Sequence, residues 1–156
     1  MPKTDNAIQQ ILKTAVLREI DAFTLYSNAA ESVAAAPAKL VLQDLAAQEV
    51  GHRRRLEALL QGRVFRVLSK TQEKKVVDLK ITDYLVEEPL GSDADLQNVL
   101  IVAGKRENSS HDLYASLAQV AEDEDSQKLF AFLADEEMMH KNRVETLYEE
   151  LILRDN

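Results

Sequence analysis

The feature that most constrains the fold is an internal repeat, because the second half of the chain matches the first when it is shifted by 88 residues. Ala15 matches Ala103, and Leu45 matches Leu133. The matches include charged and aromatic residues as well as apolar ones. A repeat of this kind indicates two units of one supersecondary design that pack against each other.

Each unit is expected to be a helical hairpin. Apolar residues recur at steps of three and four, and the four glycines and three prolines are too few for an all-β chain with many turns. The pattern predicts helices over about 5–33, 37–61, 92–121 and 125–153. Pro37 separates the first two helices, and the acidic run 122–125 separates the last two. Ser92 is expected to cap the third helix, because Ser-Asp-Ala-Asp resembles a capping box.

The segment 62–91 between the second and third helices is too long for a turn and predicts a crossover along the full height of the bundle. The second and third helices would then run parallel. A chain of 156 residues suits one core better than two, so residues 1–156 are expected to form a single domain. The predicted fold is all-α, a four-helix bundle of two antiparallel helical hairpins.

Two Glu-x-x-His pairs occupy matching positions of the repeat. Glu49 and His52 are three residues apart, and so are Glu137 and His140. On a helix this spacing puts both side chains on one face, about 4.5 Å apart along the axis, so both can reach one ion. Two of the chain's three histidines take part, which argues against coincidence.

A single glutamate precedes each pair by 30 residues, with Glu19 before Glu49 and Glu107 before Glu137. The midpoints of both intervals fall in the predicted turns. Each hairpin therefore returns its pair to the level of the single glutamate, about 22 Å from the turn. Packing the two hairpins together would gather four carboxylates and two imidazoles in the middle of the bundle.

Such a group of carboxylates predicts a metal centre. Four glutamates in an apolar interior would repel one another and take up protons, whereas two divalent cations would balance their charge. The chain has no cysteine, so the ligands would be oxygen and imidazole, which suit iron or manganese and also accept zinc. Tyr26 and Tyr114, seven residues after the single glutamates, could support the ligands with hydrogen bonds. The alternative is a solvated charged face with two ordinary Glu/His pairs.

These residues also carry a resemblance to a known family. Ferritin-like carboxylate proteins have single glutamates on two helices and Glu-x-x-His on the other two. The segments 79–86 (Leu-Lys-Ile-Thr-Asp-Tyr-Leu-Val), 103–107 (Ala-x-Lys-Arg-Glu) and 133–140 (Leu-Ala-x-Glu-Glu-x-x-His) resemble the stand-alone rubrerythrin-like proteins of the ferritin-like superfamily. This resemblance covers nearly the whole chain and implies a bundle that holds two iron ions. The implied ligands are Glu19, Glu49, His52, Glu107, Glu137 and His140, with Glu49 and Glu137 as bridges between the metals.

Two departures from the family pattern bear on activity. Rubrerythrins proper have a further glutamate where this chain has Ser110. They also carry a cysteine-rich rubredoxin domain that delivers electrons, which these 156 residues lack. Peroxide reduction would therefore need an external electron donor.

Other residues near the predicted centre are assigned supporting or packing roles. His111 lies one turn after Glu107 and is expected to support the site or the core, with a seventh ligand as the alternative. Glu136 aligns with Gln48 in the repeat, so Glu137 is the expected ligand of that pair.

Three surface or packing features are expected on the second and fourth helices. The run 53–55 of three arginines spans most of a helix circumference and is expected to be solvated or paired with acids. Phe132 and Met139 are expected in the apolar face of the fourth helix, with the methionine as a packing residue and not a ligand.

The predicted function is redox chemistry, in which two ferrous ions supply two electrons to hydrogen peroxide or dioxygen. The alternatives are ferrous iron oxidation with iron buffering, and a structural bundle that keeps metal for stability. A net charge of −8 disfavours nucleic acid and anionic membranes as partners. The lack of an apolar signal core or of a long apolar run predicts a cytoplasmic location. The amphipathic helices favour a homodimer.

Overall fold

The computed structural model describes residues 7–61, Tyr84 and residues 95–153. Within these residues the chain forms α1 (Ala7–Ser32), α2 (Ala36–Gln61), α4 (Leu96–Val120), α5 (Glu124–Tyr148) and the π-helical turn η2 (Glu149–Leu153). The predicted all-α four-helix bundle is confirmed.

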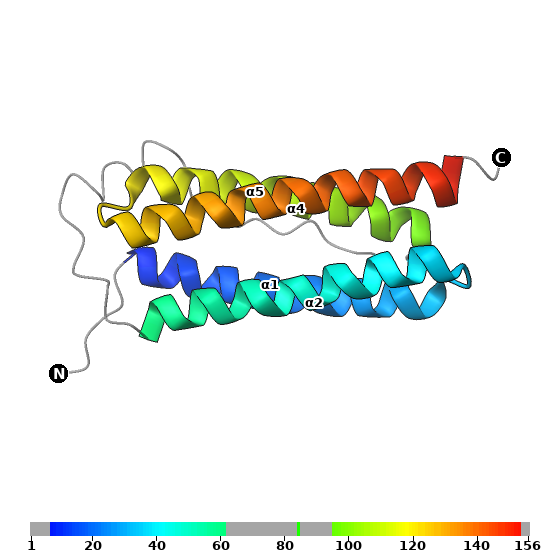
Figure 1. Cartoon of the computed structure of the whole chain (residues 1–156), viewed down its shortest axis with the longest axis horizontal. Coiled ribbons are helices and arrows are strands. Elements are labelled where there is room, and N and C mark those ends of the chain that lie inside the picture. Colours follow the sequence, from blue (N-terminus) through cyan, green and yellow to red (C-terminus); the bar gives the residue numbers. More distant parts are fainter. Residues whose placement is uncertain (1–6, 62–83, 85–94, 154–156) are drawn as a thin grey trace.

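The four long helices are arranged as two antiparallel hairpins (Figure 1). One hairpin consists of α1 and α2 and the other of α4 and α5, while α1 also contacts α4 and α2 contacts α5. The end of α2 and the start of α4 lie at opposite ends of the bundle, so these two helices run parallel as predicted (Figure 1). The predicted crossover 62–91 lies outside the described residues except for Tyr84, whose carbonyl accepts a hydrogen bond from Arg18 on α1.

The helix ends follow side-chain capping. Helix α4 begins at Leu96, because the Asp95 carboxylate accepts a hydrogen bond of 2.9 Å from the Asn98 backbone N–H. Asp95 itself has an extended backbone, so the prediction that this helix begins near Ser92 is wrong. Asp123 caps α5 in the same way, with a bond of 2.9 Å from the Ser126 N–H. Both caps satisfy amide groups that have no partner within a helix.

The hydrophobic core is divided into two apolar halves with a polar layer between them. One half contains Leu12, Leu56, Leu117 and Leu133, near the turn between α4 and α5. The other half lies near the turn between α1 and α2 and contains the following residues: Leu25, Leu42, Leu45, Leu100, Val144 and Leu147. The predicted ligand positions fall between these two halves along every helix. The core therefore shields the middle of the bundle from solvent at both ends.

Two of the expected packing residues on α5 are exposed. Phe132 is 39% exposed and Met139 is 57% exposed, whereas Phe130 is buried. Several neighbouring apolar residues on α5 could occupy its single inward face, and helical periodicity alone does not predict which of them are buried. Arg55 of α2 lies over the ring of Phe132 at 4.7 Å from its centroid. No helix in the described part of the chain is long and apolar enough to cross a membrane.

Candidate metal centre

Six ionisable side chains from four helices meet in the polar layer. Helices α1 and α4 each supply one glutamate, and α2 and α5 each supply a Glu-x-x-His pair. All six side chains are at most 3% exposed: Glu19, Glu49, His52, Glu107, Glu137 and His140. The structure thus brings together every residue that the sequence predicts as a metal ligand.

The two histidines each face carboxylates of both hairpins. His52 Nδ1 lies 2.8 Å from Glu137 Oε1 and 3.6 Å from Glu19 Oε2. His140 Nδ1 lies 2.7 Å from Glu49 Oε1 and 3.7 Å from Glu107 Oε2. Each single glutamate thus lies near a different histidine, and the carboxylate closest to each histidine comes from the Glu-x-x-His pair of the other hairpin, although His52 Nδ1 also lies 3.7 Å from Glu49 Oε2 of its own pair.

The centre is compact enough for metal ions. One ligand atom from each of Glu49, His52, Glu137 and His140 lies within 4.8 Å of the others. The two imidazole rings are stacked, with their centroids 5.2 Å apart. Oxygen and nitrogen atoms at such separations can share a cation, and this cluster could hold a metal ion.

Unpartnered atoms at the centre fit this interpretation. Five buried atoms that face the cluster have no hydrogen-bond partner among the described residues: Glu19 Oε2, Glu49 Oε2, His52 Nδ1, Glu107 Oε2 and Glu137 Oε1. Buried polar atoms are nearly always partnered, and a carboxylate left without one carries a large desolvation cost. A cation among these atoms would satisfy all of them at once.

In the metal-free centre, burial and the neighbouring negative charges both oppose ionisation of the glutamates that lie between the two histidines. Burial raises the pKa of Glu49 and Glu137 well above the usual value of 4.5, and the charges of Glu19 and Glu107 raise both further. Glu19 behaves differently. Burial opposes its ionisation, but hydrogen bonds with Glu49 and His52 outweigh burial and lower its pKa.

His52 is held in its charged form by its neighbours. Burial lowers its pKa, but interactions with Glu137 and Glu19 outweigh burial and raise the pKa from 6.5 to about 10. A metal-bound imidazole must be neutral, so a cation at this position displaces a proton from the ring. Bound protons therefore offset the negative charge of the carboxylates in the metal-free centre, and cations would compete with these protons for the same side chains.

The two tyrosines cross between the hairpins. The Tyr26 hydroxyl on α1 donates a hydrogen bond of 2.6 Å to Glu107 on α4, and the Tyr114 hydroxyl on α4 donates one of 2.6 Å to Glu19 on α1. Each tyrosine lies seven residues after the glutamate on its own helix. Because helical side chains lean toward the N-terminus, its hydroxyl points back toward the height of that glutamate and reaches the glutamate of the neighbouring helix. The sequence predicts hydrogen bonds from these hydroxyls without revealing the crossed pairing.

A comparison with protein families supports the fold and the cluster together. The chain matches the family described as Rubrerythrin over residues 10–148, which is most of its length. This chain belongs to the rubrerythrin family. Comparisons with curated proteins and with solved structures found no match.

Around the centre, the structure also places residues whose roles the sequence left undecided. Half-buried His111 donates a hydrogen bond of 2.8 Å from Nδ1 to the Ala134 carbonyl and is not in the group of Glu49, His52, Glu137 and His140 that could hold a metal ion. Glu136 is partly exposed, whereas Glu137 is buried in the centre. In the arginine run, Arg53 pairs with Glu57 at 3.1 Å.

One neighbour of the centre was missed by the sequence analysis. Gln48 Oε1 lies 2.7 Å from His140 Nε2, although the two residues belong to different hairpins. Gln48 also donates a hydrogen bond of 2.8 Å to Asp44. The four-residue spacing of Asp44 and Gln48 is a signal of this pair within α2, but nothing local links it to His140.

A small cavity leads to the carboxylates between α1 and α4. Its lining includes Glu19, Glu107, Arg18, Arg106 and Ser110. Ser110 places a short hydroxyl at the edge of the centre. The cavity is a polar space beside the glutamates with room for about one water molecule.

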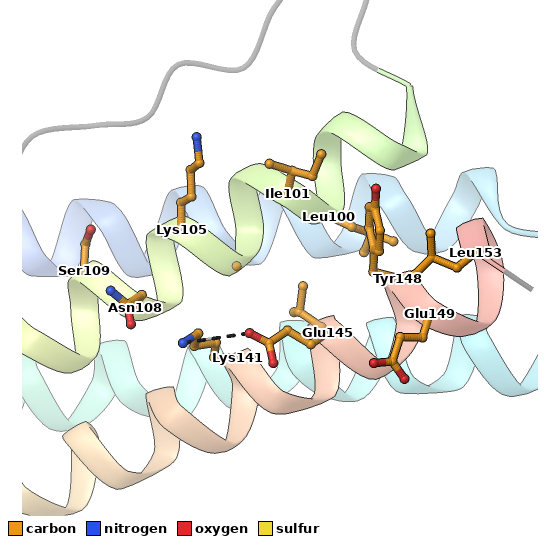
Figure 2. Close-up of a pocket in the computed structure, with 12 residues that line it drawn as sticks. Leu100, Ile101, Lys105, Asn108, Ser109, Lys141, Glu145, Tyr148, Glu149 and Leu153 are labelled. Carbon is orange, nitrogen blue, oxygen red and sulfur yellow. Dashed lines mark ion pairs between the residues drawn. The ribbon is translucent and has the colours of Figure 1, made fainter.

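A larger groove lies elsewhere on the bundle, between α4 and the end of α5 (Figure 2). Leu100 and Ile101 line one side of it, and Tyr148 and Leu153 line its end (Figure 2). None of the six predicted ligands contributes to this groove. Its size therefore carries no information about the metal chemistry.

Proposed function

We propose that this protein is a di-iron carboxylate protein that reduces hydrogen peroxide. The observation that carries the proposal is the buried set of four glutamates and two histidines in a chain of the rubrerythrin family. An apolar core does not keep four carboxylates without a function, because their burial costs free energy. Dioxygen is the second oxidant that the same centre would accept.

The six side chains divide into two half-sites with shared glutamates. Glu19 and His52 would hold one iron, and Glu107 and His140 would hold the other, in accord with the distances between these pairs. Glu49 and Glu137 lie between the half-sites and would serve both ions. Four carboxylates balance two divalent cations, and a ligand set rich in oxygen suits iron or manganese.

Two ferrous ions, when bound, supply the two electrons that convert one peroxide molecule and two protons into two water molecules. The chain's own residues prepare the surroundings of this reaction. The apolar core halves exclude bulk water from both ends, and peroxide would approach the glutamates through the small cavity beside Ser110.

The tyrosines keep their protons in the metal-free centre. Burial raises the pKa of Tyr26 and Tyr114 well above 10, and the charge of the neighbouring glutamates raises it further. Each hydroxyl therefore continues to donate its hydrogen bond to Glu107 or Glu19 at neutral pH. These bonds hold the carboxylate oxygens in place while the charge at the centre changes.

Ferrous oxidation with iron buffering is the second candidate function. It is favoured by the composition, because these 156 residues contain no cysteine and so no thiolate centre that could relay electrons. Without an external donor, such a centre would react once and then hold ferric iron. An external electron donor is therefore part of the peroxidase proposal.

Stopped-flow oxidation of protein loaded anaerobically with ferrous iron tests the proposal. We expect about two irons per chain to be oxidised rapidly by peroxide and more slowly by dioxygen, with continued turnover only when a reductant is added. Equal rates with both oxidants, together with iron uptake well beyond two per chain, would replace the peroxidase proposal with iron oxidation and storage. A homodimer and a cytoplasmic location remain predictions from the sequence.

A further inference from the structure

A chain of polar contacts connects His140 to the surface of the bundle. Arg143 Nη1 donates a hydrogen bond of 2.8 Å to Asp44 Oδ2. Gln48 Nε2 donates one of 2.8 Å to the same oxygen. The Gln48 amide is thereby oriented so that its Oε1 faces His140 Nε2 at 2.7 Å.

This orientation selects the tautomer of His140. An amide oxygen can only accept, so the proton of the neutral ring lies on Nε2. The lone pair of Nδ1 is then directed at Glu49 and the centre of the cluster, where Nδ1 lies 2.7 Å from Glu49 Oε1. A cation requires this tautomer and this ring orientation.

The repeat provides a counterpart for each member of the chain, but the contacts are not repeated. Arg143 matches Arg55, and Asp44 matches Phe132 at the same offset of 88 residues. Arg55 lies over the Phe132 ring, 4.7 Å from its centroid, and that ring offers no hydrogen-bond acceptor. Both halves of the repeat therefore have an arginine at this position, but among the described contacts only Arg143 belongs to a polar chain.

The second histidine consequently lacks outer support. Glu136 matches Gln48 in the repeat, yet His52 Nε2 is buried and has no hydrogen-bond partner within residues 7–61, 84 and 95–153. The His52 ring is held from within the cluster, by stacking on His140 and by Glu137 at 2.8 Å from Nδ1, but no described residue accepts a hydrogen bond from its Nε2. His140 has both kinds of support, because Gln48 also holds its Nε2.

We propose that the two metal positions are inequivalent and fill in order, the His140 position first and the His52 position second, because only His140 is held by the Gln48–Asp44–Arg143 chain. Gln48, Asp44 and Arg143 are positioning residues that act through His140. The proposal depends on the proposed function only in that the centre binds two metal ions. Loss of an outer hydrogen bond to a metal-binding histidine typically weakens metal affinity about 10–100-fold, so we expect two binding steps separated by about that factor.

Anaerobic titration with cobalt(II), followed by visible absorption and calorimetry, tests the order of filling. The full chain should bind one cobalt tightly and a second about 10–100-fold more weakly. His52→Ala should retain the tight step and lose the weak one, and His140→Ala should do the reverse. Two steps of equal affinity, or loss of the tight step in His52→Ala, would overturn the proposal.

Matched variants test the polar chain itself. Gln48→Leu and Arg143→Leu should weaken the tight step while leaving the weak step unchanged. Arg55→Leu is the repeat-related control and should change neither step. Circular dichroism and thermal unfolding of the metal-free variants separate these effects from misfolding. Equal weakening of both steps by Gln48→Leu would contradict a role through His140.

A transplant of the polar chain provides the opposite test. The double substitution Phe132→Asp and Glu136→Gln places an acceptor for Arg55 and an amide for His52 at positions that tolerate polar residues, because both are partly or fully exposed. The weak step should strengthen toward the tight one. If two ordered steps are found but iron-loaded protein does not react with peroxide, the proposed function fails while the inequivalence stands; no cobalt binding would overturn both.

Discussion

Glu49 and Glu137 are the two residues of the centre whose ionisation is most strongly opposed by burial and by neighbouring carboxylates. Both are nearly inaccessible, and burial together with neighbouring carboxylates raises the pKa of each well above 4.5. In the metal-free protein these residues therefore tend to stay protonated. The same property that weakens the metal-free fold prepares the centre to exchange protons for cations.

Substitution of one of two adjacent glutamates should separate metal binding from surface charge. Glu137→Gln should strongly reduce the metal content, because it removes a buried anionic ligand, whereas Glu136→Gln should leave the metal content nearly unchanged. Elemental analysis of both purified variants after identical loading measures this difference. Similar losses in the two variants would show that the repeat register does not identify the ligand.

The same substitution should stabilise the metal-free protein in a pH-dependent way. A raised folded-state pKa contributes stability below pH 4.5, and that contribution is lost as the pH rises through the folded-state pKa. Metal-free Glu137→Gln should therefore become more stable than the parent as the pH rises, by about 1–2 kcal/mol. Urea unfolding at pH 5 and pH 8 tests this, and a gap that shrinks with rising pH would contradict the sign.

Metal binding should release protons from several groups. Glu49 and Glu137 must ionise and His52, with its pKa of about 10, must become neutral before they bind a cation. Metal affinity should consequently fall as the pH is lowered from about 8 to 6. Calorimetry in buffers with different ionisation enthalpies counts the released protons, and an identical heat in all buffers would rule out this exchange.

At the scale of the helices, capping determines where the elements begin and thus the height of their side chains. Asp95 and Asp123 each accept a hydrogen bond from an amide that has no intrahelical partner. Both helices of the second hairpin start at such a cap, and both carry ligands about three turns or more further on. The caps fix the starting point from which Glu107 and Glu137 reach a common level.

Removal of one cap should therefore destabilise the hairpin measurably. Asp123→Ala should lower the free energy of unfolding by about 1 kcal/mol, since the Ser126 amide loses its acceptor. Asp125→Ala, an exposed substitution in the first turn of α5, is the matched control and should have a smaller effect. Chemical denaturation of both variants measures the difference, and equal losses would assign the effect to charge near the helix end.

At the scale of the whole molecule, the centre joins two hairpins that otherwise share fewer contacts than each has internally. Tyr26 and Tyr114 tie α1 to α4, while Gln48 and His140 tie α2 to α5. Ligands from both hairpins would add metal bonds to these links. Metal binding is thus expected to couple the stability of the two halves.

Removal of metal should lower the stability of the complete fold. Free metal at 100 times its dissociation constant stabilises a protein by about 2.7 kcal/mol, which corresponds to about 5–10 °C in the unfolding temperature of a chain of this size. Thermal unfolding with metal, and again after chelation, measures this shift. An unchanged unfolding temperature would argue against ligands from both hairpins binding the same ions.

The sequence by itself determined the helical hairpins and the meeting of the Glu-x-x-His pairs with the single glutamates. Those features depend on helical periodicity, on repeat spacing and on turns at the midpoints, all of which can be read from neighbouring residues or from distances counted along the chain. The tertiary structure alone decided which residue of one hairpin faces which residue of the other. Tyr26 reaches Glu107, and Gln48 reaches His140, because of how the helices lie side by side and how their side chains lean. Likewise Phe132 is exposed under Arg55, since packing chose Phe130 for the core.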